Sequence, residues 1–179
     1  MNLNSNSKYK YAMASGLILG IIQAALVLTI SLMGIDIIRP PLYYSLINIT
    51  VVVIVIVYGT KRYRDELLGG VINYSKAFWF GVLICVFAGI IYGVYMVAHV
   101  NIIDKTYLTQ FFSTIEEEYY KAGFNEKEIS DAMKIIEWMQ KPIGMVIFKI
   151  FELSFTGILI SLFTSIFLKK RETTLKIQN

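Results

Sequence analysis

Four long apolar segments alternate with charged segments along the chain. They cover residues 12–33, 42–59, 77–100 and 145–168, and the first three contain no charged side chain. An α-helix rises about 1.5 Å per residue and therefore needs roughly 20 apolar residues to cross a hydrocarbon core about 30 Å thick. The pattern predicts four transmembrane helices, of which the second is only just long enough.

The segment between the third and fourth spans, residues 104–141, is polar but has a helical period. Its apolar side chains recur on one helical face at Leu108, Phe111, Phe112, Ile115 and Tyr119. Gly123 is in the position of a helix C-cap, and Asn125 followed by Glu128 has the spacing of a capping box that starts a second helix. We therefore expect one all-α membrane domain, residues 1–179: a four-transmembrane-helix bundle with an amphipathic helical hairpin between spans three and four.

The composition agrees with a membrane protein. Of the 179 residues, 56% are hydrophobic and 17% are charged, and the mean hydropathy is +0.59. Soluble domains have about 45–50% apolar and about 25% charged residues. These values argue against a soluble enzyme, a nucleic-acid-binding protein and a disordered chain, so we expect the lipid bilayer, and not nucleic acid, as a partner.

The distribution of basic residues predicts the orientation. Ten of the 17 lysines and arginines lie in residues 1–11, 60–76 and 169–179, whereas six lie in the loops on the opposite side. Cytoplasmic loops of membrane proteins carry an excess of Lys and Arg. Both termini are therefore expected in the cytoplasm, with the hairpin on the outer side.

Four polar side chains inside or beside the spans form a candidate intramembrane cluster: Asn48, His99, Lys149 and Glu152. Lys149 and Glu152 are three residues apart and so share a helical face. An ionisable group at membrane depth costs a few kcal/mol and marks either a pathway for a solute or a structural partner. In the structural alternative, Lys149 extends to the interface and Glu152 is hydrogen-bonded to Asn48 or to a helix end.

Small residues follow the spans at intervals of four. The glycines that form these smooth faces are Gly16, Gly20, Gly81, Gly89, Gly93 and Gly157. Such faces allow helix backbones to approach closely in lipid, either within the bundle or between subunits.

A conspicuous motif lies between the second and third spans. It consists of Arg64, Asp65, Glu66, Gly69, Gly70, Tyr74 and Ala77. Its charges and its glycine pair indicate a structured connection, because glycine permits sharp turns with positive φ. The lone Cys85 and lone His99, and the absence of nucleotide-binding, zinc and nucleophile-elbow motifs, predict no cofactor, no metal site and no catalytic residues.

This motif resembles that of the bacterial membrane-protein family called domain of unknown function four-one-nine-nine. The similarity continues at Asp104 and Tyr107, at Pro142 and at the Lys-Lys that ends the last span, and covers nearly the whole chain. The resemblance implies a four-span inner-membrane protein of Gram-negative bacteria with a periplasmic hairpin. It implies no activity and transfers no catalytic residue.

Three functional hypotheses follow. The first is a non-enzymatic scaffold, accessory subunit or self-associating module, with a homo-oligomer or a membrane partner protein. The second is a small oligomeric transporter or channel that uses the polar cluster. The third is a lipid-acting membrane enzyme that uses Asp65, Glu66 or Glu152.

Overall fold

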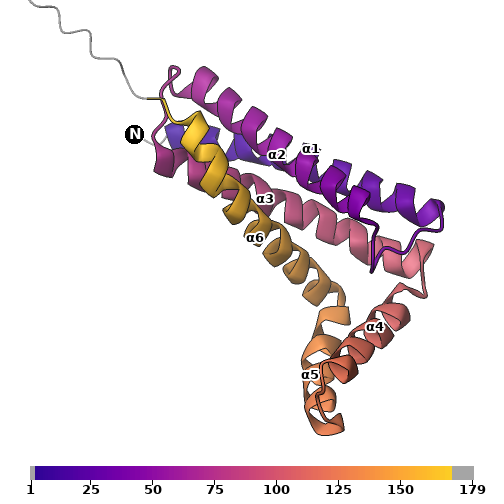
Figure 1. Ribbon diagram of the computed structural model, residues 1–179. Coiled ribbons are helices and arrows are strands. Elements are labelled where there is room, and N and C mark those ends of the chain that lie inside the picture. The colour runs from indigo at the N-terminus through magenta and orange to yellow at the C-terminus, as the bar shows by residue number, and fades with distance from the viewer. Residues whose placement is uncertain (1–2, 171–179) are drawn as a thin grey trace, which may run out of the picture.

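The computed structural model describes residues 3–170, and these residues are almost entirely helical (Figure 1). The helices are α1 (Leu3–Leu32), α2 (Leu42–Leu67), α3 (Tyr74–Ala98), α4 (Tyr107–Lys121), α5 (Glu126–Gln140) and α6 (Pro142–Leu168), and a π-helical turn, η1 (His99–Ile103), continues α3. Four of them, α1, α2, α3 and α6, are long and apolar enough to cross a membrane. The predicted fold class, an all-α membrane-type bundle with a helical hairpin, is confirmed.

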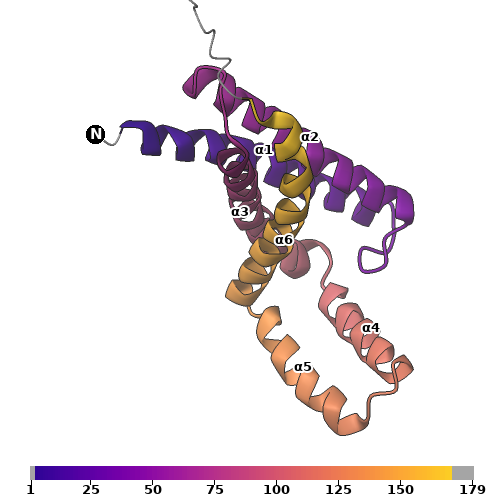
Figure 2. The same cartoon turned by 60° about the vertical axis from the view of Figure 1, so that its left-hand side comes forward.

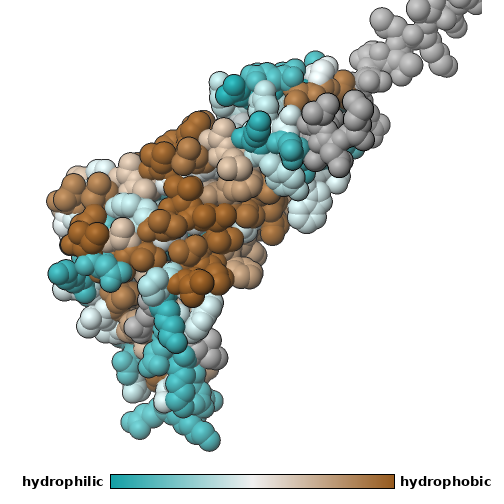
Figure 3. Space-filling model, turned by 180° about the vertical axis from the view of Figure 1, so that it is seen from behind, coloured by the Kyte–Doolittle hydropathy of each residue, from teal (hydrophilic) through white to brown (hydrophobic). Residues whose placement is uncertain are grey.

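The four long helices run alternately up and down, so the bundle has two distinct ends (Figure 1). We call the end where α1 begins and α6 finishes the terminal end, and the end that carries α4 and α5 the hairpin end. On the face drawn in Figure 3, an apolar surface covers the middle of the bundle and hydrophilic surfaces lie at both ends, as expected of a protein that spans a bilayer.

The helices are longer than the apolar segments that predict them. α1 begins at Leu3 and α2 continues to Leu67, past the last apolar residue of its span. The extension of α2 is compatible with helix because Lys, Arg, Glu and Leu are good helix formers, and Arg62 and Glu66 form an i,i+4 ion pair. Hydropathy detects the part of a helix that lies in lipid, not its polar continuation.

Helix α3 forms the centre of the bundle. It packs along α1 on one side and along α6 on the other, and it contacts α2 less extensively. Phe80, Ile84, Cys85 and Ala88 of α3 are fully buried. α3 is therefore the element against which the other spans are positioned.

Glycines allow this close packing. All six glycines of the smooth faces lie at helix–helix contacts within the chain: Gly16 and Gly20 of α1 face α3, Gly81, Gly89 and Gly93 of α3 face α6, and Gly157 of α6 faces α3. A Cβ atom added at Gly89 would lie 2.6 Å from the Cα of Ile150, which is closer than van der Waals contact permits. The small-residue faces are used inside a single bundle.

Helices α4 and α5 form the amphipathic hairpin, which projects away from the bundle (Figure 2). Gly123 has a φ of 86° after α4, and the predicted capping box of Asn125 and Glu128 starts α5. Arg39, in the loop between α1 and α2, pairs with Glu117 and Glu118 of α4 at 3.3 and 2.7 Å. The hydrogen bond from Lys121, with a further one from Arg39, lowers the pKa of the Glu117 carboxyl. These ion pairs link the hairpin to the α1–α2 loop.

Replacing Gly89 by alanine is expected to destabilise the protein, because the new methyl group meets the backbone of α6 and not a flexible side chain. Overpacking of this kind lowers stability by about 1–3 kcal/mol. Thermal unfolding in detergent, followed by circular dichroism, should show a lower midpoint. Val94→Ile adds one carbon at an exposed position of the same helix and serves as the control; equal midpoints for the two variants would contradict the close contact.

Candidate functional site

The motif between α2 and α3 joins three helices at the terminal end. Arg64 donates a hydrogen bond to the carbonyl oxygen of Leu168 at 3.2 Å and pairs with Asp65 at 2.7 Å. Tyr74 donates its hydroxyl proton to the carbonyl of Leu162, also at 3.2 Å. The last carbonyls of a helix lack partners within that helix, so Arg64 satisfies one at the end of α6.

Other residues of the motif complete this connection. We call the motif, Arg64, Asp65, Glu66, Gly69, Gly70, Tyr74 and Ala77, together with its contacts to α1 and α6, the terminal clasp. Glu66 accepts hydrogen bonds from the hydroxyl of Tyr11 on α1 at 2.7 Å and from Arg62 at 2.9 Å. Gly69 and Gly70 turn the chain with φ values of 64° and 85°, and Ala77 is buried in α3. An isolated antiparallel bridge joins Ile72 to Lys170. The charged groups of the motif are thus used to hold α1, α2 and α6 together.

Helices α2 and α6 are joined at the terminal end but separate at the hairpin end. Toward the hairpin, α6 diverges from α2 (Figure 1). Side chains of both helices line a cavity of about 380 Å³ there. We call it the hairpin-end cavity. Its polar lining includes Tyr44 and Asn48 of α2, Tyr92 of α3, Tyr107 of α4, and Lys149 and Glu152 of α6.

The ion pair of Lys149 and Glu152 is the main charged feature of this cavity. The Lys149 ammonium donates a hydrogen bond to Glu152 Oε2 at 2.7 Å. It lies 5.2 Å from the centre of the Tyr92 ring and 5.6 Å from that of Phe148, within reach of a cation–π interaction. The Lys149 side chain is 14% exposed and that of Glu152 47%. The ammonium is therefore the more buried of the two charged groups.

Asn48 is paired with a residue of another span. It donates to Gln23 Oε1 at 2.7 Å and accepts from Gln23 Nε2 at 3.5 Å, and Gln23 is fully buried. Beyond this amide pair, toward the terminal end, the bundle is filled by side chains such as Leu19 and Val52, which are also fully buried. The cavity lining includes Asn48 but no residue of the terminal end, so the cavity is blind on that side.

The structure brings together three of the four residues of the expected polar cluster. Asn48, Lys149 and Glu152 line the cavity, whereas His99 does not. His99 is fully buried, its Nδ1 lies 3.0 Å from the hydroxyl of Tyr95, and its Nε2 has no hydrogen-bond partner among the described residues. It lies at the start of the π-helical turn, apart from the charged pair.

Three tyrosines of the cavity were not among the expected site residues. Tyr44 lies at the start of a span, and tyrosine is enriched there because its ring suits the interface between membrane and water. Tyr107 lines three hollows: the cavity, an apolar pocket of about 60 Å³ under the hairpin, and a polar groove of about 490 Å³ between α4 and the α1–α2 loop. Burial raises the pKa of the Tyr107 phenol, which keeps its hydroxyl protonated as a hydrogen-bond donor. Its position connects the cavity to the polar surface at the hairpin end.

The fold and the cavity define a class: an all-α, multi-span protein of the membrane type with a polar, charged cavity in one half of the bundle. The chain belongs to the family described as "Protein of unknown function (DUF4199)", whose model matches residues 14–170, and the resemblance drawn from the sequence is confirmed. Searches of curated proteins and of solved structures returned no significant match. The family description names no activity, so the function must be argued from the site.

Arg64→Gln is expected to destabilise the terminal clasp, because a largely buried guanidinium no longer bonds the end of α6. Loss of a hydrogen bond to a charged group costs about 1.5–3 kcal/mol, and the thermal midpoint in detergent should fall. Arg62→Gln removes a more exposed arginine two residues away and should have a smaller effect. A larger loss in Arg62→Gln than in Arg64→Gln would contradict the role given to Arg64.

The charged pair of the cavity should show strong coupling in a double-mutant cycle. Glu152→Gln leaves the ammonium of Lys149 without its anion and is expected to lower stability by about 1–3 kcal/mol. Lys149→Met combined with Glu152→Gln removes both charges and should recover most of that loss. Chemical unfolding in detergent measures the two single variants, Lys149→Met and Glu152→Gln, and the double variant. Purely additive effects would show that the two side chains do not depend on each other.

Proposed function

We propose that the protein is a membrane-embedded ligand-binding protein, a carrier or receptor subunit, which holds a small zwitterionic group in the hairpin-end cavity. The observation that carries the proposal is the Lys149–Glu152 pair inside that cavity. It develops the transporter hypothesis in preference to the scaffold hypothesis.

The size and chemistry of the cavity support ligand binding. Pockets for small molecules have volumes of about 300–1,000 Å³ and combine apolar walls with a few polar groups. The hairpin-end cavity has a volume of about 380 Å³, and its polar lining offers an ammonium, a carboxylate, an amide and phenols. The adjacent opposite charges can exchange their mutual contact for contacts with a ligand that also carries both charges.

The blind end of the cavity favours binding over free conduction through one chain. The Gln23–Asn48 pair and the fully buried side chains beyond it separate the cavity from the terminal end. A continuous pore would require a lining that reaches both ends of the bundle. A cavity that reaches only one end of the bundle supports a receptor site, or one state of a carrier.

The other two hypotheses have less structural support. The scaffold hypothesis was motivated by smooth glycine faces, but these faces pack within the chain and offer no free surface for self-association. The enzyme hypothesis relied in part on Asp65 and Glu66, whose carboxylates are paired with arginines in the terminal clasp.

The proposed orientation places the terminal end in the cytoplasm and the hairpin end outside, which is the periplasm in the inner membrane of a Gram-negative bacterium. The basic residues at the terminal end, such as Lys61, Arg62 and Lys169, support this assignment under the positive-inside rule. Arg171 and Lys176 of the basic tail lie outside the described residues. The cavity would then face the outer leaflet.

A ligand screen with the purified full chain tests the proposal. A panel of zwitterions, comprising glycine betaine, taurine, phosphoethanolamine and phospholipids with zwitterionic heads, is added in detergent while thermal unfolding is followed. At a hundredfold excess over Kd a ligand stabilises the folded state by about 2.7 kcal/mol, so the midpoint should rise by several degrees with at least one compound. The Lys149→Met, Glu152→Gln double variant should not respond.

The control is the ion pair on α5 with the same spacing. Asp131 and Lys134 are three residues apart and solvent-exposed, so Asp131→Asn with Lys134→Met should respond like the unaltered protein. Equal shifts in the cavity variant and in this control, or no shift with any member of the panel, would contradict ligand binding at the cavity.

A further inference from the structure

The hairpin-end cavity lies between two spans, α2 and α6, and is also lined by the α1–α2 loop and by α4. Helix α6 packs on α3 throughout but leaves α2 toward the hairpin end (Figures 1 and 2). The Glu152 side chain is about half exposed, whereas the Lys149 side chain is largely buried. A molecule in the surrounding lipid can therefore reach the charged pair without passing through the water on either side.

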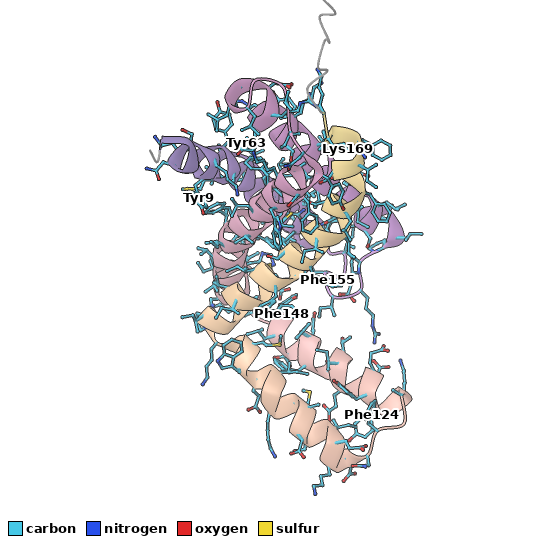
Figure 4. All side chains as sticks on the ribbon, turned by 90° about the vertical axis from the view of Figure 1, so that its left-hand side faces the viewer. Tyr9, Tyr63, Phe124, Phe148, Phe155 and Lys169 are labelled. Carbon is cyan, nitrogen blue, oxygen red and sulfur yellow. The ribbon has the colours of Figure 1, made fainter. Side chains whose placement is uncertain are left out.

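An apolar strip continues from Glu152 along α6. The strip consists of Phe155 and Leu159. It shares a helical face with Phe148 and Glu152, because these four residues are spaced by three or four positions. Phe155 is 63% exposed and Leu159 is 47% exposed on the surface of the bundle. Figure 4 shows Phe148 and Phe155 along α6 between the hairpin and the terminal end. Polar and charged groups thus lie at the hairpin side of the strip and aliphatic and aromatic ones beyond it.

We propose that the ligand is a membrane lipid with an ethanolamine phosphate headgroup, a proposal that rests on the function proposed above. Its phosphate would contact the ammonium of Lys149 and its primary ammonium the carboxylate of Glu152. The acyl chains would lie on the strip of Phe155 and Leu159. Because Glu152 lies between Lys149 and the residues that carry the acyl chains, the ethanolamine arm would fold back beside the phosphate, and each charge of the head would then meet its opposite in the cavity.

The net charge of the site selects a zwitterionic head. Lys149 and Glu152 neutralise each other, so a ligand with one positive and one negative group leaves every charge with a partner. An anionic head without a cation, such as glycerol phosphate, would occupy Lys149 and leave Glu152 beside a like charge. Such an arrangement is unfavourable in a partly desolvated cavity.

The positions of the aromatic rings favour a primary ammonium over a quaternary one. Quaternary ammonium groups are recognised by the faces of aromatic rings. In the cavity the rings of Tyr92 and Phe148 are already approached by the Lys149 ammonium. The cation of the ligand is left with Glu152, to which a primary ammonium donates hydrogen bonds and a choline group does not.

The depth of the pair agrees with entry from the side. At about 1.5 Å per residue, Lys149 and Glu152 lie roughly 10 and 15 Å from the first residue of α6. A lipid can bring its head to this depth between α2 and α6 while its chains stay in hydrocarbon. A water-soluble zwitterion would instead have to enter from the polar groove, which shares Ile37, Ile38 and Tyr107 with the cavity.

Native mass spectrometry of the full chain tests the assignment. The protein in detergent is mixed with equal amounts of phosphatidylethanolamine, phosphatidylcholine and phosphatidylglycerol that carry the same acyl chains. The ethanolamine lipid should be retained about tenfold more tightly than the other two, a ratio that corresponds to about one charge-assisted hydrogen bond. The Lys149→Met, Glu152→Gln variant should lose this preference, and the Asp131→Asn, Lys134→Met variant should keep it.

The other outcomes separate this assignment from the proposed function. Equal retention of the three lipids, or a preference that persists in the cavity variant, overturns the ethanolamine assignment. Binding of free phosphoethanolamine but not of the lipid overturns the lipid source and leaves a soluble ligand for the same cavity. If neither these compounds nor any other zwitterion binds, both the assignment and the proposed function are overturned.

Discussion

The close contact between α3 and α6 is the constraint on which the rest of the structure depends. In a membrane the hydrophobic effect does not drive helices together, so close packing between small residues has to do so. At Gly89 the contact is to the backbone of α6: an added Cβ would lie 3.0 Å from the carbonyl oxygen of Lys149. The α3–α6 contact therefore fixes the backbone of the residue that carries the cavity's positive charge.

The two ends of the bundle differ because α2 and α6 are joined at only one of them. At the terminal end, Arg64 bonds the last turn of α6, and the bridge between Ile72 and Lys170 adds a second link. At the hairpin end, Arg39 reaches the hairpin and not α6. Helix α6 is held along α3 and at the terminal clasp, but its first turns do not contact α2. The gap between α2 and α6, and the cavity in it, follow from this difference.

Hydropathy and periodicity were sufficient to predict the spans, the hairpin and its capping box, because each depends on residues close together in sequence. The cavity was only partly predictable. The shared face of Lys149 and Glu152 follows from their spacing, but the pairing of Asn48 with Gln23 joins two spans whose relative rotation no local pattern specifies. Tyr107 reaches the cavity because the chain turns back at residues 104–106, between η1 and α4. The motif around Arg64 was recognised as structured, yet its partner, a helix end 104 residues away in sequence, could not be inferred.

The charged pair of the cavity contributes little net stability, which is the physical argument behind the binding role proposed for it. An ion pair removed from water gains little net free energy, because the loss of hydration offsets the attraction between the charges. The pair of Asp131 and Lys134 on α5 has the same spacing, yet both its side chains are more than half exposed, so it keeps most of its hydration. The ammonium of Lys149 contacts the carboxylate of Glu152 and the rings of Tyr92 and Phe148 in place of most of its water. A methionine would fill the same space without that loss, which supports the proposed role of Lys149 in binding an anionic group.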